Sequence, residues 1–202
     1  IILQSEIPKP GINVSLIPYV TGRGSEDIEK KDPADYSGNA GLDAKVGLTP
    51  SLNLDLTVNP DFSNVEVDRQ VINLTRFEFG FPERRQFFLE NNDLFSGPGY
   101  PDTRVFFSSR IGLATDTSGN IVRVPIQYGA RVSGKLGKQW RLGVMNMQTE
   151  KVKSIGLPSQ NYTVAVLQRQ VLKRSNIDVV LVNKESLGLG EYDSTKFYHN
   201  SV

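Results

Sequence analysis

The residues best suited to chemistry lie between Arg76 and Glu90, where arginines and carboxylates alternate with phenylalanines. Charged side chains in a poorly hydrated space must pair and hydrogen-bond, because an isolated buried charge is costly. A guanidinium group suits this role, since its five donors can serve several carboxylates or carbonyls. We therefore select six candidates that would lie in such an enclosed space, or lumen, or bind a ligand there: Arg76, Glu78, Glu83, Arg84, Arg85 and Glu90.

Several uses of this charged set stay open. One is an ion-paired plug or gate that braces a surrounding wall. Another is a ligand site, in which a passing sugar or anion is contacted by Arg76, Glu78, Arg84 and Glu90. A third is an acid/base pair of glycosidase type among Glu78, Glu83 and Glu90. The carboxylate separations do not follow from the sequence, and we assign no catalytic residue.

Composition narrows the class of protein. Of the 202 residues, Lys and Arg number 23 against 22 Asp and Glu, and this balance does not favour a nucleic-acid partner. Hydrophobic residues make up 38%, and no run approaches the roughly 20 apolar residues of a spanning helix. The chain has no cysteine and a single histidine, His199, so we predict no metal and no cofactor.

Alternating apolar and polar residues flank the charged stretch on both sides and predict long strands. Such alternation fits a sheet with one face on lipid and one on a wet interior, and it equally fits a half-buried sheet of a soluble protein. The predicted hairpins are Gly41–Val58, then Ile121–Leu136 with Lys138–Thr149, then Asn161–Lys173 with Asn176–Lys184.

Four further elements are predicted around these hairpins. Ile12–Val20 is a strand candidate whose Pro18 places it at an edge, and Thr21–Gly38 is a polar loop. Arg104–Leu113 is predicted as a strand, and Phe81–Asn91 as a short helix that begins at a proline. We expect the helix to pack its phenylalanines on an inner wall, while its charged residues hydrogen-bond to one another or to backbone.

Four stretches closely resemble a family of bacterial outer-membrane barrel proteins. They are NLDLTVNPDFSNVEVDRQVINLTRFEF, FPERRQFFLENNDLF, FFSSRIGL and GARVSGKLGKQWRLGVMNMQT. Members of that family usually carry an N-terminal carbohydrate-binding domain of the family-9 type, followed by a large C-terminal barrel of uncharacterised function. The chain is similar to the start of the barrel region, and the likeness is strongest between Gly38 and Glu150.

The resemblance implies an all-β fold: part of a transmembrane antiparallel β-barrel with an inserted irregular and short-helical lumen segment. It implies the outer membrane of a Gram-negative bacterium and contact with its lipid, and it suggests glycans and other envelope proteins as partners. The function expected is that of a pore, transporter or assembly component. A cell-surface carbohydrate-binding module or glycoside hydrolase without transport, built on a secreted β-sandwich, is the alternative.

We divide the chain into a lead-in strand with a polar linker, residues 1–37, and a barrel region, residues 38–202. Residues 61–95 form a plug-like insertion in the barrel region. The chain opens on IILQSEIPKP, without a charged and then apolar signal region, and ends on KFYHNSV. We expect it to be an interior piece of a longer exported protein.

Overall fold

A computed structural model describes residues 12–25, 35–60, 83, 85–98, 105–116, 121–188 and 199–201. Most of them belong to one eight-stranded antiparallel sheet. Its strands, in spatial order, are β1 (Val14–Ser25), β2 (Asp35–Thr49), β3 (Leu52–Val58), β6 (Ile126–Leu136), β7 (Trp140–Thr149), β8 (Ser159–Gln170), β9 (Asn176–Leu187) and β10 (His199–Ser201). A small second sheet pairs β4 (Leu113–Thr115) with β5 (Ile121–Arg123).

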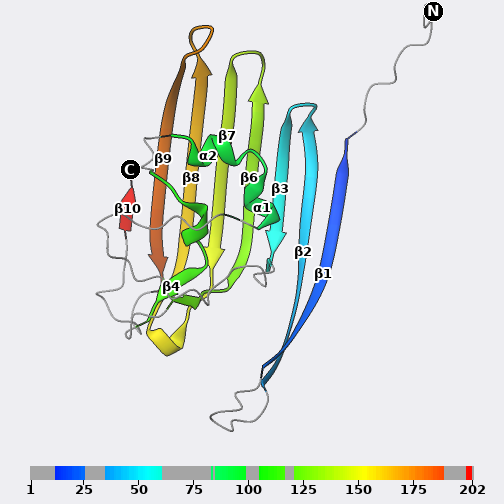
Figure 1. Cartoon of the computed structure of the whole chain (residues 1–202), viewed down its shortest axis with the longest axis vertical. Helices are drawn as coiled ribbons and strands as arrows, with labels where there is room; N and C mark the ends of the chain where they lie inside the picture. Colours follow the sequence, from blue (N-terminus) through cyan, green and yellow to red (C-terminus); the bar gives the residue numbers. More distant parts are fainter. Residues whose placement is uncertain are drawn as a thin grey trace, which may run out of the picture.

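The strand order of the main sheet follows the chain except where β3 pairs with β6. The chain between these two strands leaves the sheet, and its short helices lie over one face (Figure 1). The all-β class and the antiparallel pairing are therefore confirmed. Over the described residues the sheet is open, with β1 and β10 at its edges, so the described strands do not close a barrel.

The three predicted hairpins are confirmed as β2–β3, β6–β7 and β8–β9. Their turns, residues 50–51, 137–139 and 171–175, lie together at one end of the sheet (Figure 1). Gly137 has a φ of 71°, a left-handed conformation that favours glycine in this turn. Local alternation was enough to predict these pairs because each is joined by a short turn.

Three sequence predictions about neighbouring segments are wrong. Residues 108–110 form a 3₁₀ turn, η1 (Ser108–Arg110), where a strand was predicted. The strand predicted from Ile121 is interrupted at Pro125, which has no N–H to donate, and β5 pairs with β4 instead of extending β6. The predicted loop of residues 21–38 contains strand at both ends, because β1 continues to Ser25 and β2 begins at Asp35.

The predicted lead-in strand, β1, pairs along its whole length with β2 and so belongs to the main sheet. It is an edge strand, as its proline indicated. The division at residue 37 stays a prediction. Among the described residues, no helix is long and apolar enough to cross a membrane.

The main sheet has two faces of different character. The inner face, defined by the side chains of Arg131, Met145 and Val164, is covered by the helices and carries the buried core. The outer face, which carries Leu56, Val144 and their neighbours, exposes apolar side chains. This is the reverse of a soluble sheet, in which the uncovered face is expected to be polar.

A helical segment, residues 85–98, lies on the inner face and contains α1 (Gln86–Leu89) and α2 (Asn92–Ser96). The predicted helix is confirmed only in part, because α1 has four residues and ends before Asn91, whose φ of 51° breaks the helix. Glu83 lies before α1, and its carboxylate binds Arg85 rather than capping a helix end. The second helix, α2, was not predicted.

Aromatic and aliphatic side chains of the helical segment pack into the inner face. Phe87 and Phe88 meet edge to face, with ring centroids 5.1 Å apart. Packing of both phenylalanines was predicted, and both are buried against the inner face of the sheet, in a cluster with Leu94, Phe95, Phe106, Ile111, Ile126, Met145, Met147, Tyr162, Val164 and Val166.

Gly143 on β7 provides the space in which α2 sits. A Cβ at this position would lie 2.8 Å from the Phe95 ring and 2.9 Å from a Leu94 methyl. We expect Gly143→Ala to lower the free energy of unfolding by about 1–3 kcal/mol through overpacking. The control is Gly47→Ala on β2, where the new Cβ would meet nothing closer than 3.7 Å. Equal unfolding midpoints for the two variants in detergent would contradict this seating of α2.

Candidate functional site

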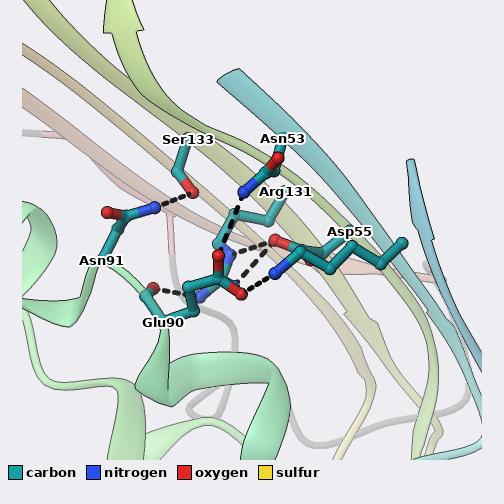
Figure 2. Close-up of polar contacts among 7 residues, drawn as sticks. Asn53, Asp55, Glu90, Asn91, Arg131 and Ser133 are labelled. Atoms are coloured by element: carbon teal, nitrogen blue, oxygen red, sulfur yellow. Dashed lines mark hydrogen bonds and ion pairs between the residues drawn. The ribbon is translucent and has the colours of Figure 1, made fainter. Parts of the chain in front are cut away.

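The centre of the site is Arg131, an inner-face residue of β6 that is only 2% exposed. Its Nε and Nη2 donate to Oδ2 of Asp55 at 3.2 and 2.8 Å. Asp55 lies directly opposite on β3, so the strand register itself brings the pair together. Nη1 of Arg131 donates to the backbone oxygen of Glu90 at 2.8 Å, and this bond joins the sheet to the helical segment (Figure 2).

Glu90 also binds the main sheet through its side chain. Its carboxylate accepts hydrogen bonds from Lys45 of β2 and, at 3.0 Å, from Asn53 of β3. The hydrogen bond from Lys45 lowers the pKa of Glu90 more than burial raises it. The next residue, Asn91, donates to Ser133 of β6 at 3.0 Å (Figure 2). We call this group the polar anchor: Lys45, Asn53, Asp55, Glu90, Asn91, Arg131 and Ser133.

A second cluster ties the start of the helical segment to η1. Arg85 donates to both carboxylate oxygens of Glu83 at 2.7 Å, and to the backbone oxygens of Ser108 and Ile111 at 2.7 and 2.6 Å. Its guanidinium also lies 4.1 Å from the centre of the Phe88 ring. Burial raises the pKa of Glu83, but the hydrogen bonds and charge of Arg85 outweigh this, so the pKa lies below its usual value.

A third contact lies near the turn end of the sheet. Arg141 of β7 donates two hydrogen bonds to Asp93 of α2, at 2.6 and 3.1 Å. The Asp93 side chain is 65% exposed, against 36% for Glu90 and 7% for Glu83. This contact is therefore expected to contribute little to stability on its own.

The structure describes three of the six candidate residues. Glu83 and Arg85 bind each other, whereas Glu90 belongs to the polar anchor, so the three serve two separate clusters. Arg76, Glu78 and Arg84 lie outside the described residues. Glu83 and Arg85 hydrogen-bond to each other and Arg85 also to backbone, as expected, whereas the Glu90 carboxylate binds Lys45 and Asn53, side chains outside the candidate set.

Sequence reasoning missed the residues of the main sheet that bind the helical segment. Asp55 and Arg131 stand at polar positions of alternating strands, which indicated a wet face but not a buried pair. The signal that could have found them is the register of β3 against β6, but a long stretch of chain separates these two strands, so no local pattern sets that register. Among the described residues, no cluster of histidines and carboxylates is arranged to hold a metal ion.

Acid is expected to loosen the helical segment. The pKa of Glu90 and of Asp93 lies below the ordinary values of 4.5 and 3.8, because Lys45 and Arg141 bind the ionised carboxylates. The stability from these pairs is complete above the ordinary pKa and is lost as the pH falls through the lowered one. The thermal midpoint should therefore fall between pH 6 and pH 3 less in Glu90→Gln than in the parent protein. Identical pH dependence would contradict a contribution from Glu90.

Comparison with known proteins gives one family. Searches against curated proteins and against solved structures gave no match. A family model described as "Domain of unknown function (DUF5916)" matches residues 10–193, which include every strand of the main sheet except β10. Because the match covers most of its 202 residues, the chain belongs to the DUF5916 family.

Proposed function

We propose that this chain is part of a bacterial outer-membrane β-barrel that acts as a pore, transporter or assembly component. In this proposal the outer face contacts lipid, and the helical segment is a brace or gate inside the lumen. The observation that carries the proposal is the apolar outer face of a sheet whose inner face holds the Arg131–Asp55 ion pair, because a membrane barrel turns an apolar face to lipid and keeps charged groups inside.

One row across the sheet illustrates this outer face. Six strands in succession place an aliphatic residue in the same row, and none of the six is buried: Val46, Leu54, Val132, Val144, Ala165 and Leu181. A contiguous exposed apolar surface of this kind marks a partner or a membrane in a folded protein. Lipid is the partner of the proposal because the apolar surface runs along many strands rather than forming a local patch.

The apolar band has a polar border on β7 to β9. The next row on these strands is Asn146, Thr163 and Asn183, and Asn146 donates to Thr163 at 2.8 Å. On β3 and β6 the same row is still apolar, with Leu56 and Ala130. The border therefore crosses the strands obliquely, as expected where strands tilt through a bilayer.

Strand length and the interior support the same proposal. Strands β6 to β9 have 10 to 12 residues, which meets the need of about 9–11 for a tilted strand to span a bilayer. Arg131 and Asp55 pair on the inner face of the sheet, so in this proposal their charges lie on the side away from the lipid. The resemblance to barrels linked to carbohydrate-binding domains makes a glycan the proposed solute.

The alternative is a cell-surface carbohydrate-binding module or glycoside hydrolase without transport. A glycosidase needs a general acid whose pKa is raised. Both described glutamates of the candidate set, Glu83 and Glu90, have a lowered pKa because cations bind them. This observation favours a structural role for these carboxylates over an acid/base role.

Conductance of the full-length protein in planar bilayers tests the proposal. We expect a defined pore whose conductance increases when residues 66–93 are deleted, because that deletion removes α1 and part of α2 from the lumen. Absence of any pore, together with release of sugar from polysaccharide, would support the alternative instead.

A further inference from the structure

A groove of about 700 Å³ lies beside the polar anchor, on the side of the short turns. Asn53, Glu90 and Asn91 line it and also belong to the anchor. The remaining lining comes from Ser51 of the β2–β3 turn, from the ends of β6 to β9, and from the β6–β7 and β8–β9 turns. The groove therefore lies between the helical segment and the turn end of the wall.

The groove carries an excess of positive charge. Glu90, which lines it, is held by Lys45, and Arg141 is held by Asp93. Four more cations line the groove without an ion pair in the described part of the chain: Lys135, Lys138, Lys173 and Arg174. Cations from the end of β6 and from two neighbouring turns thus line one space, which favours an anion with more than one charge.

Amide side chains supply most of the other polar groups of the groove. Six line it: Asn53, Asn91, Gln139, Gln168, Gln170 and Asn176. An amide carries both a donor and an acceptor, which match the hydroxyl groups of a sugar, although Asn53 and Asn91 each already donate one hydrogen bond within the polar anchor. Hydroxyl recognition and charge recognition are therefore available in the same groove.

We propose that this groove binds an anionic oligosaccharide, a hydroxyl-bearing chain that carries carboxylate, sulfate or phosphate groups. The inference rests on the proposed function in one respect, since the ligand passes the groove only if the inner face lines a lumen. Short turns face the periplasm in bacterial barrels, so the groove would receive its ligand from that side.

Two lining residues connect the groove to the helical segment. Arg141 binds Asp93 of α2, and Glu90 binds Lys45 and Asn53 of the wall. An anion bound in the groove competes with Asp93 for Arg141. Ligand binding is therefore expected to weaken the hold on α2, which would make the groove a control point for a gate.

The test is calorimetric titration of the full-length protein in detergent with trigalacturonate, at low and high salt. We expect binding that Lys135→Gln with Lys138→Gln weakens on the order of 5-fold or more, as for the loss of two partly exposed charge contacts. Raised salt should weaken it too, since screening acts on exposed charges. The matched control is Lys151→Gln with Lys153→Gln, two exposed lysines at the opposite end of β7.

Several results would overturn the inference. They are absence of trigalacturonate binding, equal binding of neutral maltotriose, equal binding of inorganic phosphate alone, and equal losses in the two lysine pairs. Thermal midpoints of both double variants check that they fold. Binding in detergent needs no pore, so conductance without binding contradicts only this inference, and binding without conductance contradicts only the proposed function.

Discussion

Replacing Arg131 by methionine is expected to lower the free energy of unfolding by about 3–5 kcal/mol. The cause is Asp55, a buried residue whose carboxylate would lose its guanidinium partner. The backbone oxygen of Glu90 would lose its donor as well. Urea or thermal unfolding of the detergent-solubilised protein, monitored by circular dichroism, measures the loss.

Two companion variants make this prediction specific. Arg131→Met with Asp55→Leu should recover most of the stability, because replacing a buried pair by apolar residues removes the stranded charge. Arg141→Met should cost about 1 kcal/mol or less, since its partner Asp93 is largely exposed. A cost for Arg131→Met as small as that of Arg141→Met would contradict a buried brace between wall and helical segment.

Replacing Arg85 by methionine is expected to cost a similar amount, about 3–5 kcal/mol, because Glu83 would be left as a buried charge. The side chains of this pair are 6% and 7% exposed. The backbone oxygens of Ser108 and Ile111 would also lose their donor, so η1 and the helical segment should separate. Unfolding in detergent gives the cost, and protease cleavage near residues 105–112 reports the separation.

Arg85→Lys is the informative control for this second prediction. Lysine keeps the charge but not the planar fork of donors that reaches Glu83, Ser108 and Ile111 together. We expect it to recover only part of the stability. Full recovery would mean that charge alone, and not the bridging geometry, holds this cluster.

The hairpins could be predicted from the sequence, and the reason is local. In β2–β3 and β6–β7 the alternation of apolar and polar residues fixes the faces, and the short turn fixes the register. The pairing of β3 with β6 is different, because 67 residues separate Val58 from Ile126 and no local pattern sets their register. That register is what brings Asp55 opposite Arg131.

The sequence predicted that the charged residues of the candidate site would pair and that its phenylalanines would pack, but it did not predict the partner of each charge. The mixture of charges and phenylalanines indicated a segment whose charged groups must pair and whose aromatic rings must pack. Arg85 pairs with Glu83 and also lies over the ring of Phe88, which is buried in the core. The choice of partner depends on tertiary placement: Arg85 also meets backbone oxygens near η1, and Glu90 meets a lysine of β2. The extra helix α2 was missed because the break at Asn91 has no periodic signal.

Membrane contact of the outer face is the central claim, and lipid quenching tests it most directly. The chain has no cysteine, so a cysteine introduced at one position is the single bimane-labelling site within residues 1–202. Leu181 and Val182 are neighbours on β9 with side chains on opposite faces, and Leu181 is 48% exposed. In bilayers of full-length protein, doxyl-labelled lipid should quench the label at Leu181→Cys and leave the label at Val182→Cys bright. Quenching at neither position, with equal access of both labels to iodide, would contradict the account.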